Sequence, residues 1–94
     1  MSGEELEQRF VEIERAILFH SASGPVALEA LSMDRPVEFR AAAAKILWLK
    51  ANEMKGSASD VLSVATSLYE QSSDLRLREE LSFVISVYRA ILSK

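Results

Sequence analysis

Apolar residues recur along most of this sequence at steps of three and four, the spacing that places side chains on one face of an α-helix. In the first segment, Phe10, Ile13 and Ile17 follow this spacing. Ser, Gly, Pro and Asp residues, which favour helix caps and turns, interrupt the pattern between segments. The sequence therefore predicts an all-α fold with about five helices, over residues 4–20, 25–32, 36–55, 60–71 and 75–92.

The third predicted helix, over residues 36–55, is apolar around most of its circumference. On a helical wheel Glu38, Lys45, Asn52 and Glu53 share one narrow polar arc, and most of the remaining circumference is apolar. A helix with so little polar surface is buried against more than one neighbour, so we expect it to be the central helix. Gly56 is predicted to end it by adopting the left-handed backbone conformation of a C-terminal cap.

A shift of forty residues aligns the second and third predicted helices with the fourth and fifth. The coincident pairs are Leu28 and Leu68, Ser32 and Ser72, Asp34 and Asp74, and Trp48 and Tyr88. Two unrelated amphipathic helices that happen to be in phase would explain the matching apolar residues. They would not explain the matching Ser-x-Asp, which aligns the turns between the helices as well as their faces. An Asp at this place accepts hydrogen bonds from the free N–H groups that begin a helix. The sequence thus predicts two copies of one helix pair.

The first copy resembles a HEAT repeat, whose period is also about forty residues. Residues 27–32 (Ala-Leu-Glu-Ala-Leu-Ser) resemble the end of the repeat's first helix, and residues 34–40 (Asp-Arg-Pro-Val-Glu-Phe-Arg) resemble its turn. Residues 41–47 resemble the small-residue packing face of its second helix, so the resemblance is strongest over 27–47. The pattern is also similar to a small family of uncharacterised archaeal helical proteins. Tetratricopeptide repeats are the alternative for the helix pairs, but their period is shorter, about 34 residues.

These observations predict a single helical domain over residues 1–94. A leading helix at 4–20 precedes two antiparallel HEAT-like pairs, at 25–55 and 57–92, which form a short solenoid or a compact bundle. The resemblance implies that such helices present a concave surface to partner proteins. Two pairs are few for a solenoid, whose end repeats need capping or stacking.

Composition and charge bear on the chemistry and the cellular compartment expected of this protein. The sequence has no cysteine, which excludes disulfides and thiolate metal sites. Its start is acidic and the longest apolar stretch, at residues 41–51, is too short to span a bilayer, so we expect a cytoplasmic protein. Residues 1–34 hold seven acids and two bases, whereas residues 35–55 hold five bases and two acids. These two segments are predicted to attract each other, within one chain or between copies.

The sequence offers few groups for catalysis. His20 is the only histidine, and without a second His or any Cys we interpret it as a residue near a helix C-terminus, where the dipole favours it. The carboxylates of the first helix could bind a cation, but their spacing does not converge on one face, so we interpret them as a solvated surface. They are Glu4, Glu5, Glu7, Glu12 and Glu14. We predict a protein that is not an enzyme and that uses no cofactor or metal.

A nucleic-acid-associated helical protein is the alternative function that the sequence leaves open. Five basic residues of the central segment carry this alternative: Arg35, Arg40, Lys45, Lys50 and Lys55. Steps of five residues lead around a helix, however, whereas dedicated nucleic-acid binders cluster basic residues on one face. The formal net charge of −3 also disfavours phosphate binding.

The preferred function is a non-catalytic protein–protein interaction module, such as an adaptor, a complex subunit or a small chaperone. Five short helices with wide apolar faces offer more apolar surface than so small a core needs, which favours a protein partner and self-association, a homodimer first. Trp48 and Tyr88 are expected in the core. The candidate partner-binding aromatic residues are Phe39, Trp48, Tyr69, Phe83 and Tyr88.

Overall fold

A computed structural model describes residues 3–19, 21–33 and 35–93, except for the side chains of Glu5 and Leu6. Helices account for most of this part of the chain, and it contains no strand, which confirms the all-α prediction. The elements in order are α1 (Gly3–Leu18), α2 (Gly24–Leu31), α3 (Val37–Leu49), the 3-10 helix η1 (Ala51–Ser57), α4 (Ala58–Gln71) and α5 (Leu75–Leu92).

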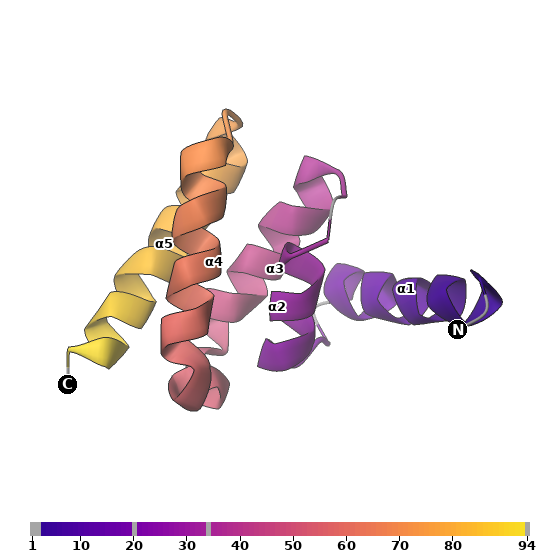
Figure 1. Cartoon of the computed structure of the whole chain (residues 1–94), viewed down its shortest axis with the longest axis horizontal. Helices are drawn as coiled ribbons and strands as arrows, with labels where there is room; N and C mark the ends of the chain where they lie inside the picture. The colour runs from indigo at the N-terminus through magenta and orange to yellow at the C-terminus, as the bar shows by residue number, and fades with distance from the viewer. Residues whose placement is uncertain (1–2, 20, 34, 94) are drawn as a thin grey trace.

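The helices form two antiparallel pairs, α2 with α3 and α4 with α5 (Figure 1). The second helices of the pairs, α3 and α5, pack against each other and run in the same direction. The first helix, α1, contacts α2 and α3 and extends away from them along the 42 Å long axis of the molecule. Because α3 packs against α1, α2 and α5, it is the central helix that the sequence predicted.

The buried side chains form a single core that takes residues from every helix. From α1, Ile13 and Ile17 enter this core. Small side chains dominate the middle of it, including Ala27 of α2 and Ala43 and Ala44 of α3, each with no exposed surface. Small residues let helix axes come close together, so the helices gain close packing and dispersion contacts without large side chains between them. The alanine-rich sequence of α3 therefore explains how three helices, α1, α2 and α5, pack closely against it.

The central helix is shorter than predicted. It ends at Leu49 instead of Lys55, and the chain continues as the 3-10 helix η1 with a non-helical backbone at Met54 (φ −116°, ψ 17°). Gly56 lies within η1 and does not adopt the left-handed conformation expected of a C-terminal cap. The prediction of one continuous helix was wrong here because apolar spacing does not distinguish an α-helix from an α-helix followed by a 3-10 turn.

Tertiary contacts account for this change of geometry. The Tyr88 hydroxyl donates to the Leu47 carbonyl oxygen at 2.8 Å, in the last turn of α3, where carbonyls lose their intrahelical partners. Just after α3, the Lys50 ammonium donates to the Ala22 carbonyl oxygen at 2.6 Å. The Gly24 N–H donates to the Glu53 carboxylate at 3.1 Å, which places a negative charge at the N-terminus of α2. These last two contacts, the η1 clamp, join the end of α3 to the start of α2.

The predicted helix caps are partly confirmed. The Asp74 carboxylate accepts from the Leu77 N–H at 3.0 Å, and so caps α5. At the preceding helix ends the Ser32 N–H and the Ser72 N–H each donate to the carbonyl four residues earlier, at 3.2 Å and 2.9 Å, but the backbone then differs, with ψ −9° at Ser32 and 138° at Ser72. Asp34 and His20 lie outside the described residues. Ser57 occupies the N-cap position of α4, but its side chain makes no capping hydrogen bond there.

Alkaline pH should destabilise the protein through Tyr88. Burial, with a smaller contribution from the charge of Glu53, raises the pKa of Tyr88 to about 12, whereas an unfolded tyrosine has a pKa near 10. The stability that follows from this difference is complete below pH 10 and is lost as the pH rises through 12, with a slope of at most about 1.4 kcal/mol per pH unit. Urea unfolding of the wild type and Tyr88→Phe at pH 9, 10 and 11 checks this. The stability difference between them should shrink by about 1 kcal/mol across the series, and a constant difference contradicts it.

Candidate functional site

Two stripes of side chains lie side by side where α3 and α5 pack together. Ala41, Lys45 and Trp48 are spaced by four and three residues along α3. Arg76, Glu80 and Phe83 repeat that spacing along α5. Because the two helices run in parallel, the stripes stay adjacent over two turns. We call this surface the α3–α5 face: Ala41, Ala42, Lys45, Trp48, Arg76, Glu80 and Phe83.

An aromatic pair occupies one end of the α3–α5 face. The Trp48 and Phe83 rings lie 5.5 Å apart between centroids and are inclined by 44°. The Trp48 indole N–H donates to the Glu80 carboxylate at 2.8 Å, so the polar end of this side chain is satisfied within the protein. Trp48 is half-buried, whereas Phe83 is 45% exposed. Such a pair contributes about 0.5–1.5 kcal/mol beyond its area burial and fixes both rings in one orientation.

The other end of the face is a shallow groove of about 170 Å³. Ala41, Ala42 and Lys45 of α3 form one side of it, and Arg76 and Glu80 of α5 form the other. The two alanines leave the floor open, while Lys45 and Arg76 are exposed at its edges. Glu80 lines the groove and also accepts the hydrogen bond from Trp48, so the groove and the aromatic pair make one continuous surface.

The other aromatic candidates lie elsewhere. Tyr88 has no exposed surface, so it does not reach a partner in this fold, whereas Phe39 is 7% exposed and lines a hollow between α1 and α3. For Tyr88 the predicted partner contact is corrected and the expected core position is confirmed, whereas for Phe39 the partner contact stays a prediction. Tyr69 is half-buried beneath the Arg78 guanidinium, 4.0 Å from the ring centroid. Arg78 also donates to the Tyr69 carbonyl oxygen at 2.7 Å, which ties this pair to the end of α4.

The five basic candidates do not share a surface. The Arg40 Nε donates to the Met33 carbonyl oxygen at 2.8 Å, and Lys50 belongs to the η1 clamp. The Arg35 guanidinium lies 3.6 Å from the centroid of the Phe10 ring, beside α1. Lys45 and Lys55 are exposed, and of the five only Lys45 borders the α3–α5 face. Three of these side chains thus hold the fold together, a role that their spacing in the sequence did not reveal.

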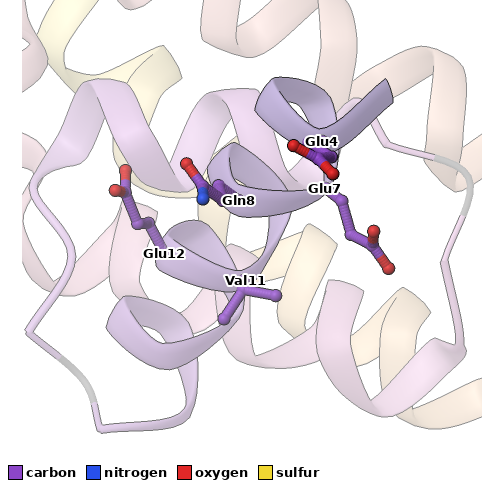
Figure 2. A pocket seen from close by; sticks show the side chains of 5 residues that line it. All are labelled: Glu4, Glu7, Gln8, Val11 and Glu12. Carbon is purple, nitrogen blue, oxygen red and sulfur yellow. The ribbon is translucent and has the colours of Figure 1, made fainter. Parts of the chain in front are cut away.

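The acidic side of α1 is open surface. Figure 2 shows side chains from this helix alone, and the Glu7 and Glu12 carboxylates point to opposite sides of it. Glu4, Glu7 and Glu12 are all exposed, as expected of a solvated helix face. Among the described residues, no three His, Cys, Asp or Glu side chains gather closely enough to hold a metal ion.

Sequence reasoning named Trp48 and Phe83 separately and missed Glu80 and Arg76. Their spacing on α5 was visible, since positions 76, 80 and 83 form a stripe beside the core positions Leu77, Leu81 and Val84. The spacing could not show which helix lies beside this stripe. Only the packing of α3 against α5 shows that the two stripes meet.

The chain matches no protein-family model, no curated protein sequence and no solved structure. The resemblance to HEAT repeats therefore stays a prediction, and the forty-residue repeat stands on this chain's own sequence and helix pairs. Within the part of the chain that the structure describes, no helix is both long and apolar enough to cross a membrane.

Proposed function

We propose that this chain is a non-catalytic protein–protein interaction module, an adaptor or complex subunit that binds a partner protein on its α3–α5 face. The observation that carries the proposal is the Trp48–Phe83 pair, held in place by Glu80 and left partly exposed. Buried aromatic anchors dominate the energy of most protein interfaces. A ring fixed before binding also loses little conformational entropy when the partner arrives.

The shape and charge of the face indicate the kind of partner segment. A groove between two helices suits an amphipathic helix that lays apolar side chains along it. Phe83 would be covered by such side chains, while the exposed Lys45 and Arg76 at the edges favour acidic residues beside them. Glu80 already accepts the Trp48 N–H, so part of its charge is engaged within the face. We therefore expect a partner helix with an apolar stripe and acidic flanks.

Truncation of Phe83 should weaken partner binding. The wild-type chain, immobilised and incubated with native cell extract, should retain a defined partner, and Phe83→Ala should retain it at least about tenfold more weakly, as the loss of an interface anchor does. Leu75→Ala is the matched control, because Leu75 also lies on α5 and is 83% exposed, away from the face. Affinities are measured with the purified partner. Equal binding by the two variants would show that the α3–α5 face is not the site.

The nucleic-acid alternative is tested with the same proteins. In a gel-shift series with duplex DNA and single-stranded RNA, phosphate binding would appear at low salt and weaken steeply as salt rises. We expect no retained complex even at low salt, because Arg40 and Lys50 donate to backbone carbonyl oxygens and the five basic residues do not share one surface. Cytoplasmic residence also stays a prediction, to be checked by cell fractionation.

A further inference from the structure

A second hollow lies between α1 and the start of α3, away from the α3–α5 face. We call it the α1–α3 groove, a space of about 230 Å³. Its floor holds the Phe10 and Phe39 rings, whose centroids are 6.0 Å apart. The lining residues are Phe10, Glu14 and Leu18 of α1, and Arg35, Pro36, Glu38 and Phe39 at the start of α3. Apolar side chains thus line the bottom, and charged side chains line the rim.

Exposed apolar side chains stand beside this groove. Leu18, which borders it, is 59% exposed, and Phe19 at the end of α1 is 77% exposed. Two large exposed apolar side chains, Leu18 and Phe19, thus lie together beside an apolar hollow, and such a cluster marks a contact surface.

The rim of the groove carries both signs of charge. Arg35 is exposed and its guanidinium lies over the Phe10 ring, which fixes its position. Glu38 is exposed and Glu14 is half-buried. Among the described residues, none of these three side chains makes an ion pair within 4.0 Å, since both recorded ion pairs belong to Arg9. One patch therefore combines exposed apolar side chains, a hollow, a positive charge at Arg35 and negative charges at Glu14 and Glu38.

We propose that the α1–α3 groove is the interface with a second copy of this chain, related by a two-fold axis. A two-fold interface uses the same patch on both subunits, so the patch must complement itself in shape and in charge. Leu18 and Phe19 of one copy fill the groove of the other, and Arg35 faces Glu14 and Glu38 across the axis. The inference rests on the proposed function, because a second copy is one partner of an interaction module. It uses a different surface from the one that binds the other partner.

Sedimentation velocity over about 1–200 μM tests the proposal. The wild type should convert from monomer to dimer within this range, as expected of an interface of modest size. Leu18→Glu should weaken dimerisation at least about tenfold, because it sets two like charges in the centre of the contact. Leu75→Glu is the control, since Leu75 is more exposed than Leu18 and lies on α5. Circular dichroism verifies that both variants keep their helices.

A charge exchange tests the two-fold geometry. Arg35→Glu and the double variant Glu14→Arg/Glu38→Arg should each dimerise poorly alone, because only like charges then meet across the axis. Mixed in equal amounts, they should form a mixed dimer, because every cross-axis pair is again attractive. A wild type that stays monomeric throughout, a dimer insensitive to Leu18→Glu, or growth beyond the dimer each overturns the proposal. If Phe83→Ala captured the partner as well as Leu75→Ala did while the dimer stayed intact, the proposed function of the α3–α5 face would fail and the dimer proposal would stand, so the two proposals fail separately.

Discussion

Tyr88→Ala should lower the free energy of unfolding by about 3–5 kcal/mol, the cost of removing a large buried aromatic side chain. Tyr88 has no exposed surface, so the whole ring volume becomes a cavity. Tyr88→Phe should cost about 1–3 kcal/mol, because it leaves the Leu47 carbonyl oxygen without its donor in the last turn of α3. The two variants together separate the packing of the ring from the hydrogen bond of its hydroxyl.

Urea unfolding followed by circular dichroism at pH 7 measures both values. Tyr69→Phe is the matched control, because Tyr69 is only half-buried and its hydroxyl makes no hydrogen bond with the described residues. Its effect should stay within about 0.5 kcal/mol. If Tyr88→Phe were as stable as the wild type, the hydrogen bond to the Leu47 carbonyl oxygen would not contribute to stability.

Gly24→Ala should lower the free energy of unfolding by about 1–3 kcal/mol, although alanine favours helices over glycine. A Cβ at Gly24 would lie 2.5 Å from the Met54 Cγ and 2.8 Å from its Sδ. Met54 is 3% exposed, so its side chain has little room to move aside. The backbone at Gly24 also donates to Glu53, and a shift of either residue would weaken the η1 clamp.

Gly56→Ala is the control for this prediction. No atom lies within 4 Å of a Cβ built at Gly56, and its backbone is not left-handed. The substitution should therefore be neutral or stabilise by about 0.4–1 kcal/mol, by restricting the unfolded chain. Thermal and urea unfolding compare the two variants. In the background of Met54→Ala, the cost of Gly24→Ala should nearly disappear, because the colliding atoms are gone. A full cost in both backgrounds would exclude the clash with Met54.

Spacing of apolar residues predicted the helices because burial on one side imposes a period that the sequence must carry. The central position of α3 followed from its narrow polar arc, and the Asp74 cap followed from residue type. The end of α3 could not be predicted in this way. There the Leu47 carbonyl oxygen accepts from the Tyr88 hydroxyl, forty-one residues away, and no local pattern records a contact at that separation.

The candidate site was harder to predict for the same reason. Trp48 and Tyr88 occupy equivalent places in the repeat, yet Trp48 is half-buried beside Phe83 and Tyr88 is enclosed. Equivalent positions in the repeat do not have equivalent neighbours, because α3 packs against α1, α2 and α5, whereas α5 packs against α3 and α4. Similarly, the sequence showed the charges of Arg40 and Lys50 but not the carbonyl oxygens that accept from them.

The 3-10 helix η1 has a consequence for cooperativity. In a simple helical array each pair meets only its neighbour, so an end pair can open alone. Here η1 contacts α2, α4 and α5, and opening either pair breaks part of the link to the other. The α3–α5 face takes one side from each pair, so it persists or is lost as one unit. A ligand bound there would therefore protect both pairs from unfolding, in proportion to the logarithm of its concentration over its Kd.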